Sequence, residues 1–261
     1  MSRILNYGSL NIDMVYSVPH FVQPGETMAA LKMEMFPGGK GLNQSAALSR
    51  AGAEVYHGGK IGPDGVWLVD FLKEKGVNTD FVSREGSHTG TAVIQVPPSG
   101  ENCIIINHGS NYEITEEEID RALEFFSPGD ILLLQNEINL LPYLIRRAGE
   151  KGMKAVLNPS PADEQLIGTD LSGLYCIILN EIEGEAFTGE NDPEKIIASL
   201  SEKYPGLKIL LTLGGSGSVY KDGNKVIRQG IYKVNAVDTT AAGDSFTGFF
   251  LALMSSGSSA E

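Results

Sequence analysis

Basic residues are scarce in this 261-residue sequence, where 20 Lys and Arg stand against 33 Asp and Glu for a formal net charge of −13. This balance excludes the broad cationic surface that nucleic acid requires, although it leaves room for a local cationic pocket. Long apolar runs are also missing, so no segment has the roughly 18 apolar residues of a membrane span. The N-terminus lacks a basic stretch followed by an apolar one. We therefore expect a cytoplasmic protein with no membrane or nucleic-acid partner.

Cysteine is nearly as scarce, because only Cys103 and Cys176 occur and both lie inside apolar runs. This pattern predicts reduced strand residues, not a disulfide or a metal-binding pair. The four histidines have no metal-ligand spacing, so we interpret them as structural or exposed. The remaining composition, 42% hydrophobic and 20% charged, is that of a globular protein with a sizeable core.

Short apolar runs alternate with amphipathic stretches of helical length along most of the chain. Predicted strands cover 4–7, 54–57, 131–135, 155–158, 176–180 and 209–213, and predicted helices cover 43–50, 66–75, 116–126, 142–151, 193–202 and 244–254. Several of the strands are continuous apolar blocks, which is typical of parallel strands covered on both faces. Thr115 and Glu118 have capping-box spacing at the start of one helix. The alternation predicts an α/β fold with a central, mostly parallel sheet flanked by helices.

Two stretches break this alternation, because they are rich in strand formers and turn residues and contain no helix. The second reads as a hairpin, TAVIQV and CIIIN joined by PPSGEN. We predict one α/β domain made of residues 1–13, 40–88 and 108–261, with residues 14–39 and 89–107 inserted in it as a small separate sheet. Such a sheet needs a pocket or a partner subunit to cover.

Polar residues gather immediately after the predicted strands. They are Asn11, Asp13, Asn136, Glu137, Asn158, Asn180, Glu181 and Glu183. In open α/β sheets, ligands bind at the carboxyl ends of the strands, where helix N-termini and free loop amides converge. Any one of these residues could instead cap a helix or form a turn, but together they favour a binding site at this edge.

The segment VDTTAAGDSF places small residues, a glycine and Asp244 before an apolar helix. Free amides of Ala241, Ala242, Gly243 and Asp244 at that N-terminus can form an anion hole for a transferring phosphoryl group. Asp244 can also accept the proton of an attacking hydroxyl. An ordinary aspartate cap on a closely packed helix remains the alternative.

Two glycine-rich segments are less specific. In PGGKGLNQ, glycines permit close approach to a ligand and Lys40 adds a positive charge, but Lys40 is followed by Gly41 and the segment is not a Walker P-loop. In GGSGSVY the third glycine of a dinucleotide-binding fingerprint is replaced by Tyr220, and the chain continues into a hairpin, SVYKDGNKVI. A nicotinamide-dependent oxidoreductase is therefore a weak alternative.

The chain resembles the ribokinase (PfkB-type) family of carbohydrate kinases. The resemblance is carried by GGKGLNQSAALSRAGAEV with KIGPDG near the N-terminus and by VDTTAAGDSFTGFF near the C-terminus. It implies a ribokinase-like fold with a small β-sheet lid, and ATP-dependent phosphorylation of the primary 5-hydroxyl of D-ribose. Two alternatives stay open: a kinase of another small sugar (fructose, ketodeoxygluconate or a nucleoside), and a truncated, non-catalytic sugar-binding homologue.

The resemblance also implies roles at the sugar end of the site. Asn11 and Asp13 would bind sugar hydroxyls, and Glu137 matches a ribose-contacting glutamate. Asp244 would be the catalytic base, beside the anion hole of Ala241, Ala242 and Gly243. The far side of the sugar would be held by Gly39, Lys40 and Asn43.

At the nucleotide end, the resemblance implies that Asn180 and Glu183 organise Mg²⁺ and the ATP phosphates. The nucleotide would be lined by Thr212, Gly214 and Gly217. Asp238 and the carbonyl of Thr240 would form part of a K⁺ site. The lid would also pair two subunits into a homodimer. Family members usually continue through another helix and strand that complete the adenine pocket and the K⁺ ligands, so a truncated chain and an incomplete nucleotide site are both open hypotheses.

Overall fold

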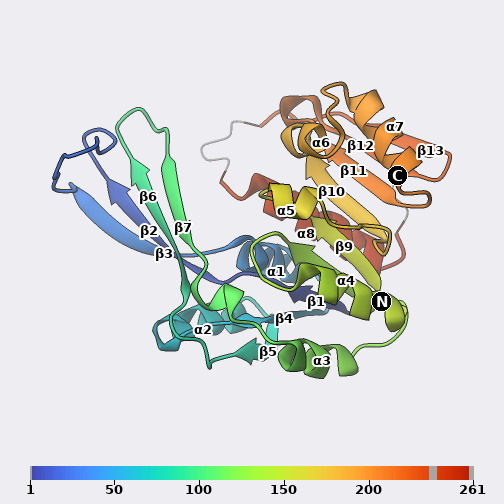
Figure 1. The fold of residues 1–261 in the computed structure, drawn as a ribbon, viewed down its shortest axis with the longest axis horizontal. Coiled ribbons are helices and arrows are strands. Elements are labelled where there is room, and N and C mark those ends of the chain that lie inside the picture. Colours follow the sequence, from blue (N-terminus) through green and yellow to red (C-terminus); the bar gives the residue numbers. More distant parts are fainter. Residues whose placement is uncertain (1, 235–239, 259–261) are drawn as a thin grey trace.

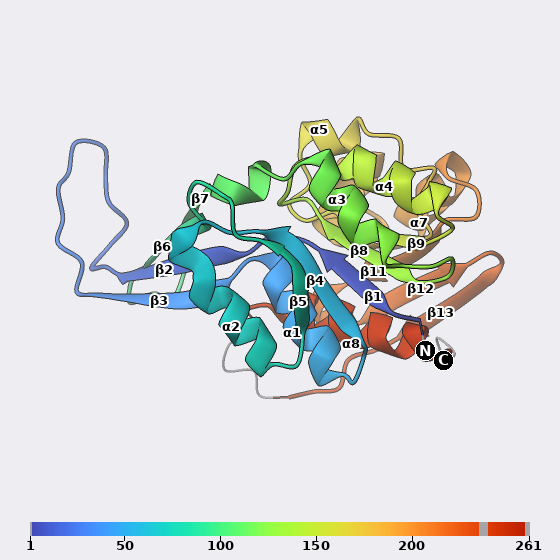
Figure 2. The same cartoon turned by 90° about the horizontal axis from the view of Figure 1, so that it is seen from below.

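The computed structural model describes residues 2–234 and 240–258, which form two β-sheets and helices on both faces of the larger one (Figures 1 and 2). The larger sheet has nine strands in the order β13-β12-β11-β10-β9-β8-β1-β4-β5. Seven of them, from β11 to β5, run parallel, and β12 and β13 are antiparallel at one edge. The predicted α/β fold with a mostly parallel sheet is thus confirmed.

The strands of this sheet are β1 (Ile4–Tyr7), β4 (Val55–Lys60), β5 (Asn78–Ser83), β8 (Ile131–Gln135), β9 (Lys154–Asn158), β10 (Cys176–Asn180), β11 (Lys208–Thr212), β12 (Ser218–Asp222) and β13 (Lys225–Gln229). Its central strands are buried along their whole length because helices cover both faces. All six predicted strands therefore form, within a few residues of the predicted bounds.

Two helical layers enclose the sheet, and each has its own apolar core. On one face lie α3 (Glu116–Glu124), α4 (Leu141–Glu150), α5 (Glu164–Ile167), α6 (Glu181–Thr188) and α7 (Pro193–Lys203). On the other face lie α1 (Lys40–Arg50), α2 (Val66–Glu74) and α8 (Ala242–Ser255). Thr115 and Glu118 form the capping box predicted for α3. None of the helices among the described residues is long and apolar enough to cross a membrane.

The smaller sheet projects from the main body in the order β3-β2-β6-β7 (Figure 1). Its strands are β2 (Asn11–Ser17), β3 (Lys32–Gly38), β6 (Gly90–Val96) and β7 (Cys103–Asn107). The predicted hairpin forms as β6 and β7, which pair antiparallel. Because β2 starts at Asn11 and β3 ends at Gly38, this sheet is rooted beside the carboxyl end of β1.

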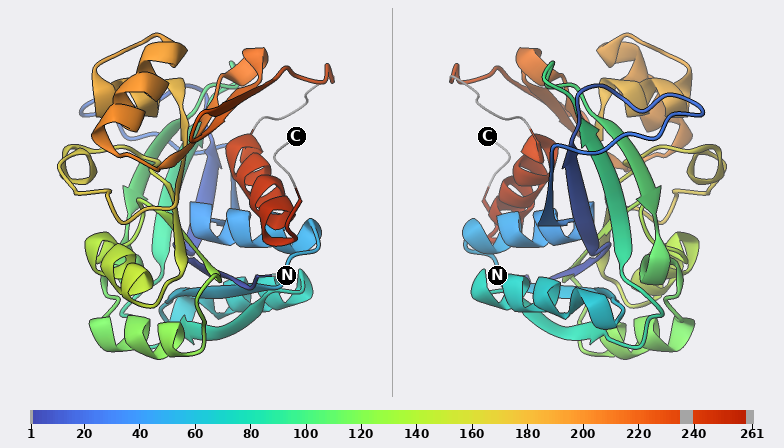
Figure 3. Two further views of the ribbon diagram at one scale, coloured as in Figure 1. Left: turned by 90° about the vertical axis from the view of Figure 1, so that its right-hand side faces the viewer. Right: turned by 90° about the vertical axis from the view of Figure 1, so that its left-hand side faces the viewer.

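Helices α1 and α8 pack against each other on one face of the larger sheet, where Figure 3 draws them in light blue and red. In their first turns, Asn43 and Gln44 contact Asp244. One turn later, Gly248 meets α1 so closely that a Cβ there would lie 2.5 Å from Ala47 Cβ and 2.9 Å from the Leu48 nitrogen. The glycine thus sets how near the two helix N-termini approach each other.

We predict that Gly248→Ala lowers the free energy of unfolding by about 1–3 kcal/mol, because the added methyl forces the two helices apart. Gly149→Ala in α4 is the matched control, since a Cβ there has no atom within 4 Å. The control should be neutral or slightly stabilising, as alanine is the better helix former. Urea unfolding measures both variants, and equal stabilities would show that the α1–α8 contact is not tight.

Candidate active site

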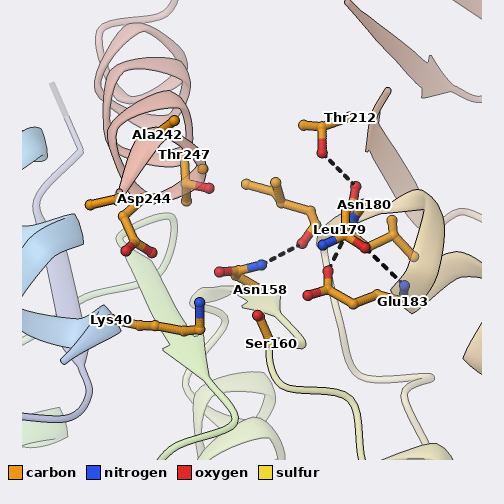
Figure 4. Close-up of a pocket in the computed structure, with 13 residues that line it drawn as sticks. Lys40, Asn158, Ser160, Leu179, Asn180, Glu183, Thr212, Ala242, Asp244 and Thr247 are labelled. Atoms are coloured by element: carbon orange, nitrogen blue, oxygen red, sulfur yellow. Dashed lines mark hydrogen bonds between the residues drawn. The ribbon is translucent and has the colours of Figure 1, made fainter. Parts of the chain in front are cut away.

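A cavity of about 180 Å³ lies at the carboxyl edge of the larger sheet, between the first turn of α8 and the ends of β9, β10 and β11 (Figure 4). Its lining residues are Lys40, Asn158, Ser160, Ile178, Leu179, Asn180, Glu183, Thr212, Ala241, Ala242, Gly243, Asp244 and Thr247. Nine of these were named from the sequence, eight with an assigned role and Asn158 as one of the polar residues at this edge of the sheet. They come from segments about 200 residues apart, so the fold is what brings them together.

The first turn of α8 presents backbone N–H groups to this cavity. Its first intrahelical bond runs from Ser245 to the carbonyl of Ala241, so the amides of Ala242, Gly243 and Asp244 have no partner inside the helix. Among the described residues, no side chain caps this end, and Ala241 turns the chain into the helix at φ 57°. An uncapped helix N-terminus that opens on a cavity is suited to hold an anion.

Asp244 is buried in the same turn, with 7% of its surface exposed. Its Oδ1 accepts a hydrogen bond of 2.8 Å from Gln44, and its Oδ2 lies 3.4 Å from Asn43 Nδ2. Burial raises the pKa of Asp244 above its ordinary value, while the charge of Lys40 and the amides of Gln44 and Asn43 oppose the rise. Figure 4 shows the Lys40 ammonium group and the Asp244 carboxylate directed into one space.

The start of α1 is bound to the end of β8 through Glu137. Glu137 Oε2 accepts from the Lys40 backbone N–H at 2.9 Å and also from the Ser9 hydroxyl. The Gly41 amide in turn donates to Ser9 Oγ at 3.2 Å. One oxygen of this buried carboxylate therefore orders the PGGKG turn, a role that its position after a strand did not reveal.

Close backbone approach explains the glycines of that turn. A Cβ at Gly41 would lie 2.4 Å from the Ser9 nitrogen, and Gly39 has φ 91°, so both positions require glycine. A Cβ at Gly38 would coincide with the Asp13 carboxylate at 2.1–2.2 Å. Glycine thus lets the carboxylate of Asp13 pack flat against the backbone of β3.

Asp13 and Asn11 lie at the root of the smaller sheet. Asn11 Oδ1 accepts from Asn111 Nδ2 at 2.7 Å. Burial, reinforced by the charge of Glu137, raises the pKa of Asp13 to about 6. Glu137, which follows β8, therefore interacts with two other predicted sugar ligands: its charge acts on Asp13, and its Oε2 accepts from the Lys40 backbone N–H.

Asn180 and Glu183 cap helix α6 in addition to lining the cavity. Asn180 Oδ1 accepts from the Glu183 N–H at 2.9 Å, and Glu183 Oε2 accepts from the Asn180 N–H at 3.0 Å. This reciprocal pair is a capping box. The two readings of these residues, cap and ligand, are compatible because the box engages one carboxylate oxygen of Glu183.

A second cavity, of about 610 Å³ and mostly apolar, adjoins the first and shares Thr212, Ala242 and Gly243 with it. Gly214 and Gly217 line it. A Cβ at Gly217 would lie 1.9 Å from the Gln229 carbonyl oxygen, so this turn has no room for a side chain. Thr240 is an exposed turn residue before α8, and Asp238 lies outside the described residues.

Several residues at the site escaped the sequence-based assignment, among them the polar residues Ser9, Gln44, Ser160 and Thr247. Ser160 and Thr247 line the cavity. Ser9 donates a hydrogen bond to Glu137, and Gln44 donates one to Asp244. Only Gln44 carried a usable signal, because it follows Asn43 in a segment already assigned to the site.

The model of the pfkB family of carbohydrate kinases matches residues 1–261. The chain belongs to that family. A ribokinase of Haemophilus influenzae is 36% identical over 255 residues, which cover 94% of this chain and 82% of the relative. The solved ribokinase of Thermotoga maritima is 34% identical with a TM-score of 0.85, over 99% of this chain and 87% of that one. Arabidopsis thaliana ribokinase, solved with ribose and ATP, is 27% identical with a TM-score of 0.84, at 99% and 87% coverage.

This membership confirms the ribokinase-like fold and the assignment as a carbohydrate kinase that the two motifs predicted. The roles of individual residues stay predictions.

We predict that sugar affinity falls as the pH drops through about 6, where Asp13 titrates. If Asp13 accepts from sugar hydroxyls as the sequence predicts, protonation removes that acceptor, so affinity should fall up to about tenfold per pH unit below that value. Calorimetric titration between pH 5 and 8 without nucleotide measures this. Asp13→Asn should bind weakly with no such step, whereas an unaltered step in that variant would assign the titration to another group.

Proposed function

We propose that this carbohydrate kinase transfers the γ-phosphoryl group of ATP to the primary 5-hydroxyl of D-ribose and releases ADP and ribose 5-phosphate. The observation that carries the proposal is Asp244, a buried carboxylate beside free helix amides at the opening of α8. Relatives named ribokinase support ribose as the substrate and ATP as the donor. Both cysteines of the chain are free, which supports a cytoplasmic location.

The proposed reaction needs a base, a hold on the γ-phosphate and exclusion of water. Asp244 accepts the proton of the 5-hydroxyl while the new O–P bond forms and the bond to the ADP oxygen breaks. The amides of Ala242 and Gly243 bind the transferring group, and Lys40 adds a positive charge on the opposite side. All of these groups border one cavity, so the reaction needs no large rearrangement of the main sheet.

Sugar recognition is assigned to the groups at the root of the smaller sheet and around the start of α1. Asp13, Asn11 and Glu137 offer acceptors for ribose hydroxyls, and Asn43 offers an amide. The nucleotide is assigned to the larger cavity at Thr212, Gly214 and Gly217, because the residues it shares with the first cavity lie where the γ-phosphate must be.

The donor set fits Mg²⁺ bound mainly through ATP. The described residues contain no group of three or more His, Cys, Asp or Glu that could hold a metal ion alone. Glu183 and Asn180 border the phosphate cavity, and Mg²⁺ usually binds one or two carboxylates, phosphates and water. When bound, the ion would neutralise charge on the phosphates. For K⁺, Thr240 and Asp238 stay a prediction, since Asp238 lies outside the described residues.

The smaller sheet is proposed as a lid over the sugar and as a dimer surface, with residues 14–39 and 89–107 as its extent. Strand register places Asp13, Phe36, Ala92 and Ile106 in one row, on the face assigned to the sugar. The next row, on the opposite face, is apolar: Met14, Met35, Val93 and Ile105. Met35 and Ile105 are 58% and 63% exposed, which supports burial against a second copy.

We expect ADP release that depends on ribose when the chain is given ATP, Mg²⁺ and K⁺. Ribose, 2-deoxyribose, fructose and adenosine should be offered separately, with ribose giving the highest kcat/KM. Asp244→Asn should keep ribose binding but lower kcat by a factor on the order of 10² or more, as for a lost general base. A coupled ADP assay measures turnover. Near-normal kcat in the variant would remove Asp244 from the chemistry, and ribose binding without turnover in the unaltered chain would favour a non-catalytic sugar-binding protein.

We predict a dimer that Ile105→Asp converts to a monomer, because the new charge would be buried in the proposed interface. Light scattering coupled to size-exclusion chromatography measures the mass. Val226→Asp is the matched control, since Val226 is 48% exposed on β13, away from the smaller sheet. A monomeric unaltered chain, or two variants with equal masses, would contradict a dimer through the lid.

A further inference from the structure

A chain of buried side-chain amides lies directly beneath Asp244. It consists of Asn6 on β1, Gln135 on β8, Gln44 on α1 and Asn158 on β9. The first three are fully buried and Asn158 is 9% exposed. Burying a side-chain amide costs free energy unless its donors face acceptors and its acceptor faces a donor. The hydrogen-bond partners therefore show which way each amide is oriented.

A backbone carbonyl at each end of this chain fixes which way every amide points. Asn6 Nδ2 donates to the Gly41 carbonyl at 2.7 Å, so Asn6 Oδ1 is the atom that accepts from Gln135 Nε2 at 2.8 Å. The same Gln135 nitrogen donates to Gln44 Oε1 at 2.7 Å. From the other end, Asn158 Nδ2 donates to the Ile178 carbonyl at 2.9 Å, which leaves Asn158 Oδ1 as an acceptor.

The NH₂ group of the Gln44 side chain must therefore face Asn158 and Asp244. Its Nε2 donates to Asn158 Oδ1 at 2.8 Å and to Asp244 Oδ1 at 2.8 Å, which uses both of its N–H bonds. A flipped amide would place Gln44 Oε1 against two acceptor oxygens and its NH₂ against the Gln135 donor. The orientation that serves Asp244 is the only one that satisfies all three neighbours.

Because of this hydrogen bond, the two carboxylate oxygens of Asp244 differ in their contacts. Oδ1 is occupied by Gln44, whereas Oδ2 has only the longer contact of 3.4 Å with Asn43. A base needs one oxygen free to take the proton and a carboxylate that cannot rotate away from the reacting hydroxyl. Among the described residues, two other charged side chains line this cavity: Lys40 from α1 and Glu183 from α6.

We propose that Gln44 is a positioning residue for phosphoryl transfer, which holds Asp244 Oδ1 and leaves Oδ2 to receive the sugar proton. The buried amides of Asn6, Gln135 and Asn158 lock Gln44 in its donating orientation. This inference rests on the proposed role of Asp244 as the base. It adds a fully buried group that does not line the cavity.

The test compares Gln44→Glu, nearly the same size, with the unaltered kinase in kcat and KM from pH 5.5 to 9. The introduced carboxyl and Asp244 must share one site, so the acid limb of the kcat profile should move up by about one pH unit or more. At neutral pH kcat should fall about tenfold or more, while the KM for ribose changes less than about threefold, since positioning acts on the chemical step. Gln165→Glu, exposed on α5, controls for the added charge and should match the unaltered kinase.

A second variant covers the case in which Gln44→Glu fails to fold. Gln135→Met keeps Gln44 in place but removes the donor that orients it, so a smaller fall in kcat with an acid limb shifted in the same direction is expected. Unaltered pH profiles in whichever of these variants folds, with Asp244→Asn inactive, would overturn the role of Gln44 alone. An active Asp244→Asn would instead overturn the proposed function on which it rests.

Discussion

The contact between α1 and α8 is the constraint on which the site depends. Gly248 and Ala47 allow the two helices to touch, and one turn earlier this contact places Asp244 against Asn43 and Gln44. Both helices begin at the carboxyl edge of the sheet, so the positive ends of two helix dipoles meet at one cavity. Segments separated by about 200 residues thereby line one cavity.

This arrangement explains how a chain with a net charge of −13 can be built to receive polyanions. Helix amides and Lys40 supply positive potential in the cavity. Burial raises the pKa of the nearby carboxylates. The pKa of Asp13 rises to about 6, and that of Asp244 is raised by burial but opposed by Lys40 and two amides. Asp13 thus stays mainly ionised at neutral pH, at the cost of desolvation.

Much of the fold could be predicted because the strands of the main sheet are apolar blocks and most helices are amphipathic. Helix α6 was missed: it begins immediately after β10, and Gly184, which weakens its helical pattern, is required because a Cβ would lie 2.8 Å from Ile196. The site motifs were found because their residue types are specific. The support of Glu137 by Ser9, and of Asp244 by Gln44, depends on contacts between distant segments that no local pattern encodes.

The two ends of the site come from different parts of the chain, and this has a consequence for specificity. Groups assigned to the sugar lie before residue 138, on β2, around the start of α1 and just after β8, whereas groups assigned to the nucleotide start at the last residue of β10. Asp244, which accepts a hydrogen bond from the Gln44 amide, lies between the sugar groups and the nucleotide groups. A substitution on the smaller sheet can therefore change which hydroxyls are matched without moving the phosphate-binding amides. Sugar selectivity and phosphoryl transfer are in this way separable on one fold.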